Sequence, residues 1–193
     1  NQFDLTSLNP IKQFLISVGA TLAKSKLHDA ISSKGTSPSE NGWYIWRDTL
    51  GEYGTNYRVR AGTALAGLGA LPAQEAAYPS TDKDSDGETL HGNRQYHLHF
   101  EAGQLPPVNA FWSLTMYNTE GYLVNNPINR YLIGSGDELT FNQDGSLSIV
   151  IQHRPPQNDT SNWLPAPDGE FSVLMRLYDT KPSFTDGSWK IPA

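Results

Sequence analysis

The spacing of apolar side chains changes along the chain, from a helical period near the N-terminus to strict alternation beyond residue 94. Between Pro10 and about Lys34, apolar positions recur at intervals of three and four residues, the spacing of one helical face. Asn9 can cap this helix, and Gly35 can end it. The same spacing predicts a second helix from Asn56 to Gly69. The apolar positions of the first helix are Ile11, Phe14, Leu15, Val18, Leu22, Leu27 and Ile31. We expect this helix to bury that face against a core.

Beyond Arg94 the apolar positions alternate with polar ones, which is the pattern of a β-strand with one face in water. The clearest example covers residues 96–101, and clusters of turn-forming residues separate it from five further candidates. These candidates are residues 110–117, 131–133, 139–141, 147–153 and 170–177. Short strands joined by such turns are typical of sandwiches and jelly rolls, whose strands run antiparallel.

Helices followed by strands predict an α+β fold, with the N-terminal helices packed on an antiparallel β-sandwich of jelly-roll type. A chain of 193 residues is long enough to bury one sizeable core. We therefore predict a single domain over residues 1–193, with a mainly helical segment at 1–70 and the sandwich at 90–193.

Composition and charge exclude some classes of partner. The net charge is -6, and no run of Lys or Arg offers a positive surface to a phosphate backbone, so we predict no nucleic-acid partner. No segment approaches the length of a membrane-spanning apolar run, so we predict no membrane insertion. The absence of cysteine leaves the compartment open, with the periplasm or cell envelope as one option. Oligomeric state is left open as well.

Two motifs resemble metal sites, but neither is complete. Asp82, Asp84 and Asp86 match the first half of a calcium loop, although Asn93 stands where a bidentate Glu is needed. A solvated acidic turn explains this segment more simply. His97, His99 and Glu101 could hold zinc or iron if His153 joins them from a neighbouring strand, but alternation places the two strand histidines on the solvent side. We predict neither a metal nor a cofactor.

Two arginines lie within apolar surroundings and therefore need acceptors. Arg130 stands between Asn129 and Tyr131, and Arg176 lies inside an apolar strand. A guanidinium in such a place requires a carboxylate or backbone carbonyls. The simpler interpretation is an internal ion pair that holds loops to the sandwich, with Asp137, Asp179 or Asp186 as the carboxylate. The alternative is a clamp for an anion or carboxylate in a cleft.

Aromatic and amide side chains supply the ingredients of a sugar-binding site. Trp112, Tyr117 and Trp163 could stack on a pyranose ring, while Asn162 could bond to hydroxyl groups. Each tryptophan taken singly is more simply explained as part of the core. We therefore keep both interpretations for these residues.

From about residue 40 to the C-terminus the chain resembles the family known as domain of unknown function 1214. The motifs that carry the resemblance include Tyr96-x-Leu98-x-Phe100, Gly103-Gln104-Leu105-Pro106-Pro107, Phe111-Trp112-Ser113-Leu114-Thr115, Asn129-Arg130-Tyr131, Asn162-Trp163-Leu164-Pro165-Ala166-Pro167 and Asp186-Gly187-x-Trp189. The resemblance implies a jelly-roll-like sandwich and, in the longer members, a further domain upstream. We expect this chain to be either the short, single-domain form or a C-terminal fragment of the two-domain form. It also points loosely towards glycans.

Three hypotheses of function follow. The first is a module that binds a carbohydrate or another polar ligand in a loop cleft, and it predicts that Trp163→Ala abolishes binding without unfolding the protein. The second is a hydrolase of a glycan, amide or ester, with Glu120 or Asp186 as general acid or base. The third is a structural or interaction protein without a small ligand. The candidate binding residues are Asn129, Arg130, Tyr131, Asn162, Trp163, Trp112, Tyr117 and Arg176.

Overall fold

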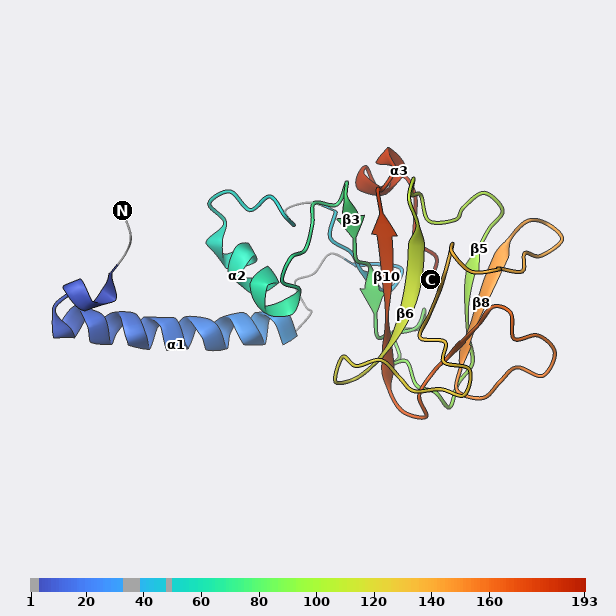
Figure 1. Ribbon diagram of the computed structural model, residues 1–193, viewed down its shortest axis with the longest axis horizontal. Helices are drawn as coiled ribbons and strands as arrows, with labels where there is room; N and C mark the ends of the chain where they lie inside the picture. The colour runs from blue at the N-terminus through green and yellow to red at the C-terminus, as the bar shows by residue number, and fades with distance from the viewer. Residues whose placement is uncertain (1–3, 33–38, 48–49) are drawn as a thin grey trace. The chain divides into compact units, whose positions relative to one another are not determined.

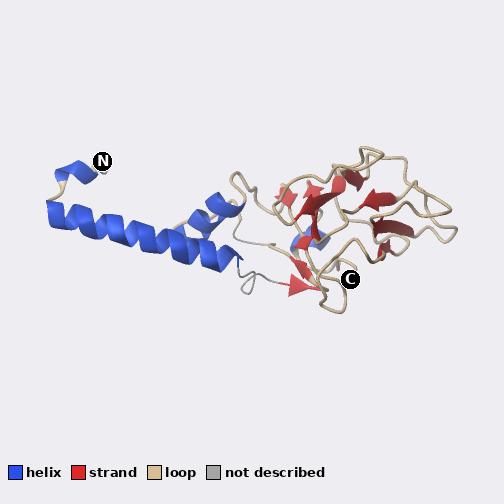
Figure 2. Ribbon diagram, turned by 90° about the horizontal axis from the view of Figure 1, so that it is seen from below, coloured by secondary structure: helices blue, strands red, loops and turns tan. Residues whose placement is uncertain are grey.

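The structure, a computed structural model, describes residues 4–32, 39–47 and 50–193 (Figure 1). Two compact units make up the chain, one from Asn1–Thr36 with Tyr53–Gly69 and the other from Ser37–Glu52 with Ala70–Ala193. Helices dominate the first unit, whereas the second contains the strands (Figure 2). The fold is α+β, as predicted. The single domain, and the packing of the helices on the strands, stay predictions.

The first unit contains a short 3-10 helix, η1 (Leu5–Ser7), and two α-helices, α1 (Pro10–Ser32) and α2 (Tyr57–Ala66). Both α-helices begin where the sequence places a capping asparagine. The Asn9 Oδ1 accepts a hydrogen bond from the Lys12 amide at 2.9 Å, and the Asn56 Oδ1 accepts one from the Val59 amide at 3.2 Å. Both predicted helices are confirmed, although Gly35 lies outside the described residues.

The described apolar side chains of α1 are exposed, and their burial against a core stays a prediction. Ile11 is 71% exposed, Phe14 66% and Leu22 59%. The sequence spacing of α1 identified a helix correctly, but spacing alone does not say what covers it. Apolar residues also occur beyond the predicted stripe, because Ile16 adds a further exposed side chain. No described helix is long and apolar enough to cross a membrane.

The second unit contains the strands and one short helix. These elements are β1 (Ser39–Glu40), β2 (Trp43–Tyr44), β3 (Ala76–Ala77), β4 (Ser80–Thr81), β5 (Tyr96–Phe100), β6 (Trp112–Asn118), β7 (Leu132–Gly134), β8 (Leu147–Gln152), β9 (Trp163–Pro165), β10 (Phe171–Tyr178) and α3 (Pro182–Thr185). Four of the predicted strands after the first appear as β6, β7, β8 and β10, with ends shifted by one or two residues.

Two sheets are formed. The larger one has the order β1-β2-β4-β10-β6-β7, with β3 also paired to β10, and every pair in it is antiparallel. The smaller has the order β5-β8-β9. Figure 1 shows β10 beside β6 and β5 beside β8. One pair departs from the predicted antiparallel arrangement, because β9 runs parallel to β8.

Alternate side chains of both sheets meet in one hydrophobic core. In β10 every second residue from Phe171 to Leu177 is buried, and the residues between them are half-buried. The Phe100 ring of the smaller sheet lies 5.8 Å from the Trp112 ring of the larger one, centroid to centroid. Tyr96 and Phe171 meet edge to face at 5.8 Å. The apolar sides of the two sheets therefore enclose a common interior.

The strand predicted at residues 139–141 is wrong. These residues form a loop because a side chain satisfies the backbone there. The Thr140 amide donates to the Asn162 Oδ1 at 3.0 Å, and the Thr140 carbonyl accepts from the Asn162 Nδ2 at 2.7 Å. A strand partner would make the same two bonds, so Asn162 takes the place of a neighbouring strand.

Candidate functional site

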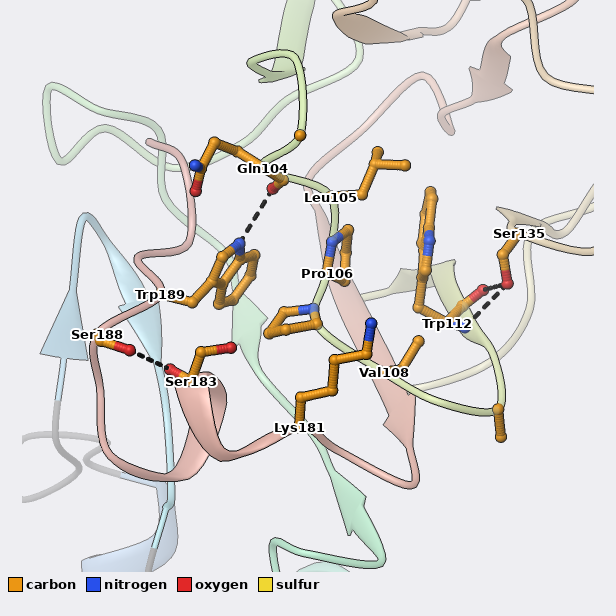
Figure 3. A pocket seen from close by; sticks show the side chains of 13 residues that line it. Gln104, Leu105, Pro106, Val108, Trp112, Ser135, Lys181, Ser183, Ser188 and Trp189 are labelled. Carbon is orange, nitrogen blue, oxygen red and sulfur yellow. Dashed lines mark hydrogen bonds between the residues drawn. The ribbon is translucent and has the colours of Figure 1, made fainter.

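A pocket opens in the second unit where four separate segments meet. The segment 103–110 forms one wall, the first residue of β6 brings in Trp112, the turn after β7 adds Ser135, and the C-terminal residues 181–189 close the other side. The cavity volume is about 750 Å³, which lies within the range of small-molecule sites. Figure 3 shows these side chains around the opening. The pocket is therefore large enough for a small organic ligand.

The floor of the pocket is apolar and firmly held. Pro106 and Pro107 are buried, Trp112 is 3% exposed and Trp189 is 5% exposed. The Trp189 Nε1 donates to the Gln104 carbonyl at 3.0 Å (Figure 3). Proline fixes the backbone on one side of the pocket, while the indole bond ties the C-terminal segment to that same loop. The floor is thus shaped before any ligand binds.

The rim carries hydroxyl groups and one amine. The Ser135 Oγ accepts from the Trp112 amide at 3.1 Å, and the Ser188 Oγ donates to the Ser183 carbonyl at 3.4 Å. The Lys181 amide donates to the Pro107 carbonyl at 2.8 Å, which fixes the backbone of this lysine. Its side chain reaches towards the space between the proline rings and Trp112 (Figure 3). Within the described part of the chain, the Lys181 Nζ has no hydrogen-bond or ion-pair partner.

The pocket has donors for a ligand but lacks an acid–base pair. Its described lining residues include no Asp, Glu or His. The nearby Asp186 accepts from Ser188, whose hydroxyl and amide hold the pKa of this carboxyl below its usual value. A general acid at neutral pH needs the opposite shift. The arrangement is suited to binding rather than to hydrolysis by paired carboxylates.

The structure brings Arg130 and Trp163 together, but as a brace between loops. The Arg130 Nη1 lies 2.9 Å, 2.8 Å and 2.9 Å from the carbonyl oxygens of Thr160, Ser161 and Trp163. The sequence interpretation expected an ion pair here, and among the described residues backbone carbonyls take the place of the carboxylate. The neighbouring Tyr131 hydroxyl makes a long contact of 3.5 Å with Asn129. The Nη1 group of Arg130 therefore already has three partners within the protein.

Asn162 and Trp163 also make internal bonds. Besides its two bonds to Thr140, the Asn162 Nδ2 donates to the Ser148 carbonyl at 3.1 Å. Trp163 is only 1% exposed, and its Nε1 donates to the Gln152 carbonyl at 2.9 Å. Both side chains thus fasten the segment 160–165 to β8. As binding residues they stay predictions, because their polar groups are used by the fold.

Tyr117 and Arg176 are brought together on the larger sheet. The Arg176 Nη2 donates to the Tyr117 hydroxyl at 2.7 Å, and its guanidinium lies 5.8 Å from the centre of the Tyr117 ring. The Arg176 Nη1 donates to the Thr115 hydroxyl at 2.7 Å. Trp112, the remaining candidate, lies on the pocket floor. The predicted site residues are consequently divided among three places.

The acidic turn and the histidine strand hold themselves together through local bonds. The Asp84 Oδ1 accepts from the amides of Asp86 and Glu88, and its other oxygen lies 3.5 Å from the Arg94 Nη1. The His99 Nδ1 lies 2.9 Å from the Ser148 hydroxyl. Among the described residues, no group of three His, Asp or Glu side chains converges as a metal site would require.

Sequence reasoning missed most of the pocket. Gly103–Pro107 and Trp189 were noted only as family motifs, and Lys181 was not noted at all. Lys181 and Trp112 are 69 positions apart in the sequence, and no periodic pattern links such distant positions. The available signal was the pair Pro106-Pro107 beside a strand that begins with Trp112, since two prolines fix a rigid wall. The proline pair predicts a rigid loop, but it does not predict which segment of the chain packs against that loop.

Comparison with known proteins gives a family and a similar fold. The family model described as "Protein of unknown function (DUF1214)" matches residues 75–182. The chain is similar to the crystal structure of the VPA0106 protein from Vibrio parahaemolyticus, with 27% identity and a TM-score of 0.69. That match covers 99% of this chain and 46% of the Vibrio protein, so the chain spans about half of the relative's length.

A second structure, of an uncharacterised protein from Burkholderia cenocepacia, is 14% identical with a TM-score of 0.45. It matches 96% of this chain and 41% of that one. None of the curated proteins matches the chain.

Proposed function

The chain belongs to the DUF1214 family of proteins of unknown function, and on the basis of its own residues we propose that it binds a polar small ligand. The binding site is the pocket between segments 103–110 and 181–189. Carbohydrate is the preferred class of ligand. The observation that carries this proposal is the combination of a preformed apolar floor with a rim of hydrogen-bonding groups. Such a combination is the usual composition of a small-molecule site.

A sugar suits this composition because its ring has an apolar face and a polar edge. Leu105, Val108 and the two prolines offer apolar contact to the C–H face. Ser135, Ser183 and Ser188 offer hydroxyl groups to the edge, and Lys181 adds a charged donor. The two tryptophans contribute mainly their edges, since almost all of each ring is buried. The tryptophans therefore shape the floor, and ring stacking is a minor part of the proposal.

The loop cleft around Asn129 and Asn162 is a weaker candidate for the same function. A ligand there would have to compete with the carbonyl contacts of Arg130 and with the Asn162 bonds to Thr140. Breaking bonds that hold two loops costs stability before any binding is gained. Carbohydrate binding is therefore assigned to the pocket. We also propose a jelly-roll arrangement for the second unit, supported by two sheets that share one core.

One observation favours the third hypothesis, an interaction protein without a small ligand. The apolar side chains of α1 are exposed over much of its length. Exposed apolar surface of this kind is uncommon on a monomer that has no partner. Size-exclusion chromatography with light scattering tests this alternative. A monomeric molar mass at every protein concentration would argue against self-association.

The proposal is tested by titrating the protein with a panel of neutral and acidic saccharides in a calorimeter. Ala110→Trp places a large ring at the exposed rim of the pocket and should abolish binding without altering the core. Gln143→Trp, at an exposed turn outside the pocket, is the matched control and should bind as the wild type does. Binding that survives Ala110→Trp, or a panel that gives no heat with the wild type, would overturn the proposal.

A further inference from the structure

Arg176 occupies the face of the larger sheet that points away from the core. Its neighbours Met175 and Leu177 are buried, whereas Arg176 itself is half-buried, as alternation along β10 requires. Both hydrogen-bond acceptors of its side chain are neutral hydroxyls, those of Thr115 and Tyr117. Among the described residues, no carboxylate is paired with this guanidinium. The charge of this half-buried guanidinium is thus stabilised by two hydroxyl dipoles and by the face of the Tyr117 ring.

The surrounding strand residues on the same face carry no charge. The register places Arg176 opposite Ser113, Leu174 opposite Thr115 and Ser172 opposite Tyr117. On the other side of β10, Leu174 lies opposite Ser80, which in turn lies opposite Tyr44. Arg176 is therefore the lone cation among the described strand residues of this face, and several of its neighbours there carry hydroxyl groups.

One further phenol, that of Tyr78, lies within electrostatic range of Arg176. Burial raises the pKa of the Tyr78 hydroxyl, the nearby Tyr178 adds to the increase, and Arg176 partly opposes it. Tyr178 is itself stacked on Phe111 at 4.5 Å between ring centroids, which limits its movement. The guanidinium thus has two half-buried aromatic neighbours, Tyr117 on β6 and Tyr78 in the connection between β3 and β4.

The hydrogen-bond pattern leaves donors without acceptors. The Tyr117 and Thr115 hydroxyl oxygens both accept from Arg176, so each hydroxyl still has its own proton to donate. In the described part of the chain neither proton has an acceptor. The remaining N–H groups of Arg176, which do not bond to these hydroxyls, also have no acceptor among the described residues. The Tyr117 hydroxyl and the remaining Arg176 N–H groups, on two half-buried strand positions, therefore lack an acceptor in the described part of the protein, while Thr115, only 2% exposed, holds the guanidinium in place.

We propose that Arg176, Tyr117 and Thr115 form a binding site for a small organic carboxylate, separate from the pocket beside Trp189. A carboxylate supplies the missing acceptors, and its oxygens match the planar fork of a guanidinium. A single negative charge also matches the single cation of this face, whereas a phosphate dianion would leave a charge uncompensated. The phenol rings around the site can contact the apolar part of such an acid.

The test is an NMR titration of the full chain with sodium acetate and sodium succinate at constant ionic strength, following the Arg176 Nε–Hε signal. We expect a saturable shift with the wild type. Tyr117→Phe keeps the ring over the guanidinium but removes one donor, so it should bind about tenfold more weakly. Arg154→Gln, at an exposed arginine elsewhere, should bind like the wild type. Arg176→Gln should show no saturable shift.

Three results would overturn this site. One is a wild-type signal that does not saturate up to roughly 100 mM ligand, which corresponds to no useful affinity. Another is equal binding by wild type and Tyr117→Phe. The third is equally tight binding of sulfate, which would indicate a general oxyanion site in place of a carboxylate site. If Arg176→Gln does not fold, Tyr117→Phe and Thr115→Val decide the outcome, since both retain the guanidinium.

Discussion

The indole Nε1 of Trp189 donates a hydrogen bond of 3.0 Å to the carbonyl oxygen of Gln104, which lies 85 positions earlier in the chain. This bond joins the C-terminal segment to the loop that precedes β6. Both walls of the pocket depend on it, because Gln104 begins one wall and Trp189 ends the other. The shape of the proposed binding site is therefore linked to the way in which the C-terminus is fastened.

Trp189→Phe should lower the free energy of unfolding by about 1–2 kcal/mol. The substitution keeps most of the aromatic ring but leaves the Gln104 carbonyl without its donor, and an unmade bond at a buried site costs about that much. Urea denaturation at neutral pH measures the change. Tyr122→Phe is the control, since Tyr122 is 67% exposed, and it should leave stability unaltered. Equal changes in the free energy of unfolding for the two variants would show that the indole hydrogen bond does not stabilise the protein.

Arg130→Ala should destabilise the protein by about 2–4 kcal/mol, because three carbonyl groups lose a charged donor together. Arg154→Ala removes the same side chain from an exposed position and should change stability by less than about 0.5 kcal/mol. Both values come from chemical denaturation. A small effect of Arg130→Ala would mean that the segment 160–163 is held by other contacts, and the brace described above would then be wrong.

Trp163→Ala should cost about 3–5 kcal/mol of stability, the range for removing a large aromatic side chain from a core. The binding hypothesis drawn from the sequence expected this variant to fold normally and lose only ligand affinity. Thermal unfolding distinguishes the two expectations directly. An unfolding midpoint equal to that of the wild type would favour a role for Trp163 in binding over one in packing.

The lowered pKa of Asp144 predicts how the stability of the protein depends on pH. Hydrogen bonds from the Ser146 hydroxyl and amide lower the pKa of the Asp144 carboxyl, the hydroxyl being the larger cause. Ser146→Ala should therefore raise this pKa towards 3.8, as NMR titration of the side-chain carbonyl would show.

A lowered folded-state pKa contributes stability above the unfolded value, and this contribution is lost as the pH falls through the folded value. The stability difference between wild type and Ser146→Ala should therefore be largest above about pH 5 and narrow below pH 3.8. An Asp144 pKa that does not respond to the substitution would contradict the assignment.

The long elements of this fold were predictable because each depends on a local pattern. Alternation identified β5 and β10, and the three- and four-residue spacing identified α1 and α2. The two-residue strands β3 and β4 are too short to show any alternation, so their pairing to β10 comes only from tertiary contacts. The parallel pairing of β9 with β8 was equally hidden, since direction is not encoded in a run of three residues.

The binding sites were predictable only in part. Arg176 was identified because a guanidinium inside an apolar strand needs acceptors, but its hydroxyl partners lie on another strand, about 60 positions away. Arg130 was identified by the same reasoning and proved to bond to carbonyls. Lys181 was missed because a lone lysine among turn residues looks like ordinary surface. Its proximity to Trp112 follows from the bond between the Lys181 amide and the Pro107 carbonyl.

The most direct test of the central claim is an NMR titration that follows the Trp189 indole Nε1–Hε1 signal while saccharides are added to the wild-type protein. If the pocket is the binding site, this signal and the Gln104 amide should shift together and saturate, while the Trp163 indole, bonded to Gln152 elsewhere, stays unchanged. Ala110→Trp should abolish the shifts. A bound saccharide that leaves Trp189 unshifted, or that moves the Trp163 signal instead, would contradict the assignment of function to this pocket.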